Sequence, residues 1–468
     1  MVDPRFQLLE MLGGNAEIAN ALADRLDRVS IGIEAGPGHG LGASVAANLL
    51  LRLIPNVRIH TAETIPRPVD SALAGAKGSP GVPDFVVRSG LLVGGADLYF
   101  SSSRWSLRVG DSPHDPLVGR GPGAAAVGAL VAGELVRRVI PEIGGVHLTG
   151  EFIWNLLDYG THLATAEPDL GPVDAVCFGV GSVGSSMVQA LLLAGATGSL
   201  VVVDGDRISP RNWYRYPLMS SSDEGPKVHW VAAKASESPL HIEAHQMSAR
   251  GFLETHDMPV RLAVAAVDSV AARREVVDVL AKETLNCGVD GLKFHVSRHS
   301  FPPDSSCAYC QYVDLAETMD ELGMYTHLSG LGSDRVAALL RGDTLTAEDV
   351  DSMVLVGRVT GEGTELIGGR LQDLARGRLY AQAAVIASEG GLGLSAPYVS
   401  GLAGSILASE VLKTGPLTSQ RLVGRVDVDM SGFPTGFQSS PSRDLSGRCL
   451  CYSTARRKGY DELWRSVA

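Results

Sequence analysis

The chain has 468 residues, and at roughly 150 residues per domain this length predicts about three domains. Apolar residues make up 45% and charged residues 20%, which excludes a disordered chain or a fibrous repeat, and six cysteines are too few for a disulfide scaffold. The 40 Lys and Arg residues against 52 Asp and Glu give a net charge of −12. This charge argues against indiscriminate binding to nucleic acid or to anionic membranes.

The N-terminal segment MVDPRFQLLEMLGG has no basic stretch followed by an apolar one, so no secretory signal is predicted. One uncharged run, Gly391–Ser409, is long enough to span a bilayer. It contains Pro397 together with several glycines and serines, and we therefore expect a loop that leads into a buried helix, with a membrane span as the alternative. These features predict a soluble, cytoplasmic protein.

The first structural unit begins at Val29, in the segment VSIGIEAGPGHGLGASVAANLLLRLIPNVRIH. An apolar strand precedes a glycine-rich loop, a helix and a second strand over 56–60. Further strands are expected within 84–109, and a helix over about 124–139.

A second unit with the same order begins at Asp174, in DAVCFGVGSVGSSMVQALLLAGATGSLVVVDGD. It is followed by an expected strand near 262–267, a helix over about 270–282 and a strand near 284–289. Alternation of this kind predicts an α/β fold with mostly parallel, doubly wound sheets, as in Rossmann-like domains.

The two halves also share a later segment. Residues 128–137 read GALVAGELVR and residues 404–413 read GSILASEVLK, and Gly38, Gly40 and Ala43 match Gly179, Gly181 and Gly184 in the two loops. Matched landmarks in the same order predict an internal duplication, although any two helices rich in small residues resemble each other. The predicted domains are 1–150 and 151–468, and the second carries an extra helical segment at about 314–389, with a capping signal at Thr346 and Asp349.

The loop with Gly179, Gly181 and Gly184 follows a strand and opens a helix, so its backbone N–H groups are placed to bind phosphate. Asp204, at the end of the next strand, is typical of an acid that binds ribose hydroxyls. Both features fit NAD as well as ATP.

The segment after that strand, VVVDGDRISPRNWYRYPL, distinguishes the two nucleotides. It contains Asp-x-Asp-x-aliphatic, then Asn212, then Arg215 three residues later. The same order continues with Lys227, Asp268–Arg273, CGVDGLKFHV, Cys307-x-x-Cys310, YVSGLAGSILASEVLK and Cys449-x-Cys451. Over about 280 residues the chain resembles the ThiF/MoeB superfamily of ubiquitin-activating-type adenylating enzymes.

This resemblance implies two adenylation folds paired about a pseudo-two-fold axis, with ATP and Mg²⁺ as cofactors. It assigns Asp204 to the ribose, Asn212, Arg215 and Lys227 to the phosphates, and Asp268 to Mg²⁺; Asp206 is a weaker candidate. Such a set suits adenylation, in which charge builds on the departing pyrophosphate.

Structural alternatives remain for these residues. Arg215 and Lys227 are alternatively solvated surface cations, Asp268 a helix cap, and Asp206 a loop-fixing residue. Arg273 is alternatively the buried partner of an acid. The chain departs from the family pattern in its loop, with Arg211 for Ser, Tyr214 for Asn and Tyr216 for Gln, which leaves the acyl substrate open.

The cysteines divide into two groups. Cys307, Cys310, Cys449 and Cys451 have the spacing of a structural Zn²⁺ site, with free thiols or a disulfide as the alternative, and the family commonly has a wider second pair. Cys177 and Cys287 lie in apolar strands and are expected in the core. The extra segment holds no cysteine where ubiquitin-activating enzymes carry their nucleophile, so we expect adenylation without an enzyme thioester.

The first half lacks the acids of the second. Its second strand is followed by HTAETIPRPVD, with no Asp-x-Asp and no Asn-x-x-Arg, which predicts a degenerate, non-catalytic copy. In the family a partner fold can donate an arginine to the site, and Arg25 and Arg28 are weak candidates for that role.

The leading hypothesis is therefore ATP- and Mg²⁺-dependent adenylation of a carboxylate, at the C-terminus of a ubiquitin-like or sulfur-carrier protein or of a peptide. An NAD(P)-dependent oxidoreductase and a non-catalytic scaffold that recognises peptides are the alternatives. No nucleic-acid or membrane partner is expected, and the chain is expected to be a monomeric pseudo-dimer or a homodimer.

Overall fold

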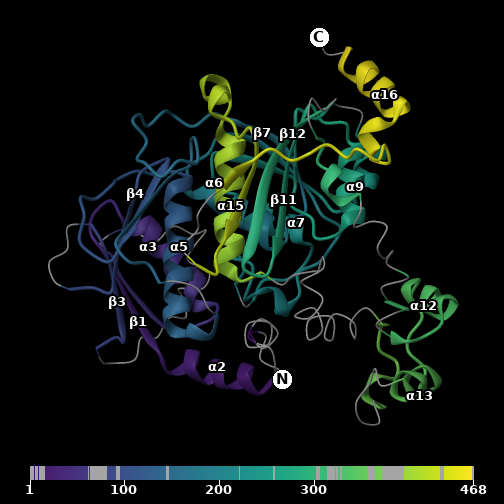
Figure 1. Ribbon diagram of the computed structural model, residues 1–468, viewed down its shortest axis with the longest axis horizontal. Coiled ribbons are helices and arrows are strands. Elements are labelled where there is room, and N and C mark those ends of the chain that lie inside the picture. The colour runs from purple at the N-terminus through teal and green to yellow at the C-terminus, as the bar shows by residue number, and fades with distance from the viewer. Residues whose placement is uncertain are drawn as a thin grey trace.

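The computed structural model describes most of the chain. The described residues are 16–61, 82–90, 95–143, 147–220, 222–256, 259–301, 306–313, 329–356, 364–371, 395–432 and 437–465, with the single residues Arg5, Leu9, Glu63, Leu322, Tyr325 and Thr326. Two sheets lie on either side of a central pair of helices, α5 and α15 (Figure 1). The fold is thus mixed α/β, as predicted.

Within the described residues, the first half forms a six-stranded sheet of order β2-β1-β3-β4-β5-β6. The first four of these are parallel, and β5 and β6 are antiparallel to their neighbours. The strands are β1 (Ser30–Ala35), β2 (Asn56–Thr61), β3 (Phe85–Ser89), β4 (Leu98–Ser102), β5 (Ser106–Gly110) and β6 (Glu151–Asn155). The helices are α2 (Ala16–Arg28), α3 (Gly40–Leu51) and α5 (Pro122–Val139), followed by the short η1 (Pro141–Ile143).

The described part of the second half forms an eight-stranded sheet of order β14-β13-β12-β11-β10-β7-β8-β9. Its strands are β7 (Val173–Phe178), β8 (Gly198–Val203), β9 (Leu240–His245), β10 (Leu262–Ala265), β11 (Glu283–Asp290), β12 (Lys293–Ser300), β13 (Gly424–Asp429) and β14 (Phe437–Ser439). Its helices are α6 (Ser182–Leu193), α7 (Lys227–Lys234), α8 (Ala249–Thr255), α9 (Val270–Asp278), α12 (Ser333–Leu340), α13 (Ala347–Leu355), α15 (Pro397–Leu412) and α16 (Thr454–Arg465). Short 3-10 turns complete it: η2 (Pro210–Asn212), η3 (Cys310–Tyr312), η4 (Thr364–Leu366), η5 (Gly415–Gln420) and η6 (Leu450–Tyr452).

The two sheets repeat one topology. The order β8-β7-β10-β11-β12-β13 reproduces β2-β1-β3-β4-β5-β6, including the change from parallel to antiparallel pairing after the fourth strand. In each half a helix follows the glycine loop, α3 or α6, and another lies between the fifth and sixth strands, α5 or α15. This repetition supports the predicted duplication.

Glycines at matched positions set the helix packing in both halves. A Cβ on Gly128 of α5 would lie 2.6 Å from Val45 of α3, and a Cβ on Gly404 of α15 would lie 2.5 Å from the backbone of Met187 in α6. Only glycine allows backbones to approach this closely. The expected buried helix in Gly391–Ser409 is α15, which is buried along its whole length.

The segment expected to be an insertion contains α12 and α13, which lie apart from the two sheets (Figure 1). The predicted capping box forms, with the Thr346 side chain accepting from the backbone of Asp349 and the Asp349 side chain accepting from that of Thr346. Residues 314–321, 357–363 and 372–394 of this segment lie outside the described residues. None of the described helices combines the length and apolar character that a bilayer crossing requires.

The boundary expected at residue 150 stays a prediction. However, β6 (Glu151–Asn155) pairs with β5 over its whole length and so belongs to the first sheet. This pairing favours a division after Asn155. A further difference is that α9 ends at Asp278, where we expected a helix to about 282, because Leu280 has a positive φ of 53°.

Buried ion pairs join the halves at their helix ends. Glu134 pairs with Arg137 at 2.6 Å in α5, and Glu410 pairs with Lys413 at the end of α15. Arg137 donates across the interface to the carbonyl of Met430 at 2.9 Å, and Lys413 donates to the carbonyl of Leu157 at 3.0 Å. Each of the two central helices therefore supplies a buried cation to a carbonyl that follows the last matched strand of the other sheet.

Glu410 holds the second of these clusters together. Burial alone would raise the pKa of Glu410, but the Lys413 and Arg298 cations outweigh it and keep that pKa below its usual value. Arg298 lies 3.1 Å from the carboxylate, and the Tyr159 hydroxyl donates to it at 2.6 Å.

We expect Glu410→Ala to lower the free energy of unfolding by about 3–5 kcal/mol, because it leaves Lys413 buried without its carboxylate and removes one of the two carboxylates that pair with Arg298. Chemical denaturation followed by circular dichroism measures the loss. Asp24→Asn is the matched control, since Asp24 forms only an exposed pair with Arg28 at 3.7 Å, and it should leave stability unchanged. Equal stability of the two variants would contradict the role given to Glu410.

Candidate functional site

The glycine loop lies at the carboxyl end of β7. Gly179 has a φ of +89°, and a Cβ there would lie 2.6 Å from the carbonyl oxygen of Ala266. A Cβ on Gly184 would lie 2.1 Å from the carbonyl oxygen of Gly179. Gly181 is the N-cap of α6, so the first N–H groups of that helix face the loop and are suited to an anion.

Asp204 ties this loop to the neighbouring strand. Its carboxylate accepts hydrogen bonds from the backbone N–H of Val180 at 2.9 Å and from that of Asp206 at 2.9 Å. The side chain is 10% exposed. Each carboxylate oxygen has further lone pairs, so Asp204 remains able to accept from the hydroxyls of a ribose.

Lys227 begins α7 and is directed back to these acids. Its Nζ lies 2.7 Å from Asp206 and 3.9 Å from Asp204, and its side chain is only 10% exposed, so it is not a solvated surface cation. Burial would lower the pKa of Lys227, but Tyr216, Asp204 and Asp206 together raise it above its usual value. Lys227 is therefore a fixed positive charge at the glycine loop.

Asn212 and Arg215 lie on the loop between β8 and α7. The Asn212 side-chain oxygen accepts from the backbone N–H of Ser209 at 2.8 Å, which closes a capping box and leaves the amide N–H₂ group to other acceptors. The Arg215 guanidinium lies 5.5 Å from the centre of the Tyr214 ring. Tyr214 and Tyr216 replace the Asn and Gln of the family pattern. Both tyrosines are buried, so they pack inside the protein beneath the loop surface.

Asp268 is exposed and lies on the loop between β10 and α9, two residues after Ala266. It is not the helix cap, because the neighbouring Ser269 accepts from the N–H of Ala272 at 3.1 Å and caps α9. The segment that carries it adjoins the glycine loop, since a Cβ on Gly179 would also contact Val267 at 3.1 Å.

Arg273 is buried, as the structural alternative expected, but its hydrogen bonds go to uncharged groups. It donates to the carbonyl of Val267 and to the side-chain oxygen of Asn286, and its guanidinium lies 5.1 Å from the centre of the Tyr312 ring. The contact with Val267 fixes the backbone beside Asp268.

The four predicted metal ligands come together. The Sγ atoms of Cys307 and Cys449 lie 3.4 Å apart, those of Cys310 and Cys449 3.6 Å, and Cys310 lies 3.8 Å from both Cys307 and Cys451. Tetrahedral coordination with metal–sulfur bonds of about 2.3 Å requires separations of about 3.8 Å. All four thiols are free and buried, so the cluster can hold a metal ion.

The remaining cysteines are core residues, as expected. Cys177 and Cys287 are fully buried, and burial raises the pKa of each thiol to about 12. A thiol that remains protonated at neutral pH is a poor nucleophile.

Sequence reasoning missed one arginine of the first half. Arg52 follows α3 and donates to the carbonyls of Trp213, Pro217 and Met219, all on the loop that carries Arg215. The signal was present, because Arg52 is a lone cation within the apolar run VAANLLLRLI. The candidates Arg25 and Arg28 instead pair with Glu142 and Asp24.

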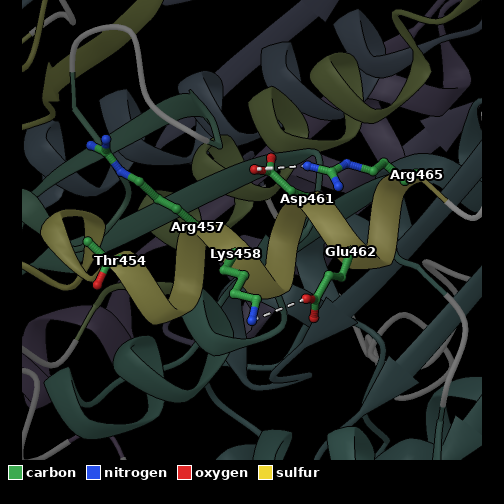
Figure 2. A pocket seen from close by; sticks show the side chains of 6 residues that line it. All are labelled: Thr454, Arg457, Lys458, Asp461, Glu462 and Arg465. Atoms are coloured by element: carbon green, nitrogen blue, oxygen red, sulfur yellow. Dashed lines mark ion pairs between the residues drawn. The ribbon is translucent and has the colours of Figure 1, made fainter.

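The pocket drawn in Figure 2 is separate from these residues. It lies on the exposed helix α16, where Lys458 pairs with Glu462 at 3.7 Å and Arg465 with Asp461 at 3.9 Å. It is lined by Thr454, Arg457, Lys458, Asp461, Glu462 and Arg465. Exposed pairs one helical turn apart are weak and are typical of a solvated helix face.

A family model described as the ThiF family matches residues 166–422, which is more than half of the chain. That range begins before the glycine loop and ends after α15. No curated protein matches the chain.

Solved structures also show similarity. E. coli MccB with MccA-N7isoASN is 13% identical with a TM-score of 0.36, over 60% of this chain and 67% of that chain. E. coli MccB alone is 13% identical with a TM-score of 0.34, over 58% and 64%. A structure of PaaA is 23% identical with a TM-score of 0.23, over 26% and 39%. The chain thus spans about two thirds of the length of MccB.

Because Ser269 rather than Asp268 caps α9, we expect Asp268→Ala to leave the free energy of unfolding unchanged. Ser269→Ala should lower it by about 1 kcal/mol, since the hydrogen bond that caps α9 is lost. Urea denaturation of both variants measures the difference. A loss in Asp268→Ala as large as in Ser269→Ala would give Asp268 a structural role instead.

Proposed function

The chain belongs to the ThiF family, and on this basis we propose that it uses ATP to adenylate the carboxylate of a peptide or of a ubiquitin-like or sulfur-carrier protein. The observation that carries the proposal is the joined set of Asp204, Asp206 and Lys227 at the glycine loop. A ribose-binding acid and a fixed cation beside a phosphate-binding loop suit ATP in particular.

In the proposed reaction a carboxylate oxygen attacks the α-phosphorus of ATP. The bond between that phosphorus and the oxygen bridging to the β-phosphate breaks, and pyrophosphate leaves with the negative charge. Lys227, Arg215 and the Asn212 amide are the groups of this chain that would bind the phosphates and stabilise that charge. The products are an acyl-adenylate and pyrophosphate.

Asp204 would hold the ribose, because both its oxygens are already fixed by backbone N–H groups and accept further bonds. Gly179, Gly181 and Gly184 would let the phosphates approach the start of α6. Asp206 would act through Lys227, whose ammonium group it contacts at 2.7 Å.

Asp268 would hold Mg²⁺. Its carboxylate is exposed, is not used as a helix cap, and provides the hard oxygen ligand that Mg²⁺ prefers. Bound Mg²⁺ neutralises charge on the triphosphate and so favours the departure of pyrophosphate. Arg273 would keep the backbone beside Asp268 in place.

The acyl group would pass directly from the adenylate to an external nucleophile. All six cysteines lie within the described residues; two are buried thiols with raised pKa values and four form one cluster. No cysteine is thus left as an exposed acceptor, which supports a reaction without an enzyme thioester.

We further assign Zn²⁺ to Cys307, Cys310, Cys449 and Cys451. Four buried sulfur ligands in a closed tetrahedral arrangement are typical of structural zinc rather than of a catalytic ion. The ion would join η3 to η6 and thereby fasten the C-terminal segment to the second half.

The proposed site predicts ATP–pyrophosphate exchange that depends on a carboxylate substrate. With a panel of C-terminal peptides and carrier proteins, we expect exchange by the unmodified protein and a loss of about 10²–10³-fold in Asp268→Ala. Ser269→Ala is the matched control, since it perturbs the same helix end but retains the carboxylate, and it should retain exchange.

Exchange that survives in Asp268→Ala would contradict the assigned site. Binding of ATP without exchange for any substrate would favour the peptide-recognition scaffold, and fluorescence quenching by NADH but not ATP would favour an oxidoreductase.

For the cysteine cluster we expect about one zinc per chain by elemental analysis, and none in Cys307→Ser. Cys287→Ser removes a buried thiol outside the cluster and should retain the metal. If Cys307→Ser retains the full zinc content, the assigned ligands are wrong.

A further inference from the structure

Arg52 lies in the first half of the chain, which lacks the Asp-x-Asp motif, and contacts the second half, which contains it. It is the C-cap residue of α3, in the first half, and its side chain is completely buried. Its guanidinium nonetheless lies against the loop between β8 and α7 of the second half.

Every hydrogen bond found for this guanidinium among the described residues goes to an uncharged acceptor. It donates to the carbonyls of Trp213, of Pro217 at 2.9 Å and of Met219 at 3.0 Å, and its Nε donates to the Asn48 side chain at 3.2 Å. It also lies 5.2 Å from the centre of the Trp213 ring. The planar guanidinium thus fixes three backbone carbonyls within the seven residues 213–219.

A cation in such a place is costly unless its donors are satisfied. Burial lowers the pKa of Arg52 to about 9, and the charge of Asp223 opposes part of that shift. The guanidinium therefore stays charged at neutral pH, and charge-assisted bonds to carbonyls are stronger than neutral ones.

The stretch that Arg52 holds contains the candidate phosphate ligand Arg215 and directly follows another, Asn212. Within it the N–H groups of Arg215 and Tyr216 both donate to the carbonyl of Asn212 at 2.9 Å, so the loop is a tight turn. The carbonyls of Trp213, Pro217 and Met219 follow on from this turn and are bound by Arg52. Displacement of Arg52 would therefore move Asn212 and Arg215 together.

We propose that Arg52 is a positioning residue through which the first half sets the geometry of the ATP site in the second. It does not contact the nucleotide; it holds the backbone of the loop that carries Asn212 and Arg215. This inference rests on the proposed function, because it requires that the loop bind ATP. The first half thereby acts on the reaction in the same chain while lacking the Asp-x-Asp and Asn-x-x-Arg motifs.

Lysine is the informative replacement. It keeps the charge and most of the aliphatic stem, but its single ammonium group lacks the planar fork that reaches three separated carbonyls. The effect of Arg52→Lys is thus one of geometry rather than of charge.

The chain offers a matched control in Arg137. It too is a buried arginine of the first half that donates across the interface, to Met430 at 2.9 Å, but its acceptor follows β13 and is not on the site loop. Loss of inter-half contact in general would affect both arginines, whereas loss of loop geometry affects Arg52 alone.

The experiment measures thermal stability, equilibrium binding of a fluorescent ATP analogue, and the KM for ATP and kcat of pyrophosphate exchange in Arg52→Lys and Arg137→Lys. We expect Arg52→Lys to weaken ATP binding and raise the KM for ATP at least tenfold. Arg137→Lys should lower the melting temperature while its KM for ATP stays within twofold of the unmodified protein. Asn48→Ala, which removes the acceptor of Nε but keeps the guanidinium, should raise the KM for ATP by a smaller factor of about two to five.

Three outcomes would overturn the inference: a KM for ATP unchanged in Arg52→Lys, an equal rise in Arg137→Lys, or, where Arg52→Lys does not fold, an unchanged KM in Asn48→Ala. Failure of the proposed function is distinguishable, because exchange would then be insensitive to Asp268→Ala as well. Exchange lost in Asp268→Ala but unaffected in Arg52→Lys would contradict only the positioning role.

Discussion

The fold depends on two buried cations that each half presents to the other. Arg137 and Lys413 occupy equivalent places at the ends of α5 and α15, each beside a buried glutamate, and each donates to a carbonyl that follows a strand of the other sheet. Inside a medium of low dielectric, removing either glutamate would leave an uncompensated charge. Each cation is neutralised by a glutamate of its own helix and also binds a carbonyl that follows a strand of the other sheet, so these contacts hold the two sheets together.

The duplicated halves have diverged in what they contribute. The second carries Asp204, Lys227 and Asp268 around its glycine loop, whereas the first retains the strand order and helix packing without the Asp-x-Asp and Asn-x-x-Arg motifs. The first half adds a packing surface for the second. Its helix α5 packs against α15, and Arg52 at the end of α3 binds the loop that follows β8. A site on a loop is only as well defined as the element behind it.

Local patterns predicted much of this structure. The glycine loop, the strands that flank it, the two matching helices and the four clustered cysteines were all expected from spacing and periodicity, because each depends on residues close in sequence or on a strict ligand spacing. The role of Arg52 was not, since its acceptors are backbone carbonyls more than 160 residues away and carry no sequence signature. The cap of α9 was likewise not predictable, because the sequence pattern allows either Asp268 or Ser269 and the structure has Ser269. The assignment of β6 to the first sheet depends on pairing rather than composition.

The sulfur cluster also determines where this chain is able to vary. The chain leaves the cluster at Cys310 and re-enters the core at the buried helix α15, so α12 and α13 lie within a loop whose ends are anchored. The entropy of closing such a loop rises only by about 0.6 kcal/mol for each doubling of its length. Residues are therefore gained or lost there at little thermodynamic cost, and the segment is a natural place for relatives of this chain to differ in length while the two sheets stay unaltered.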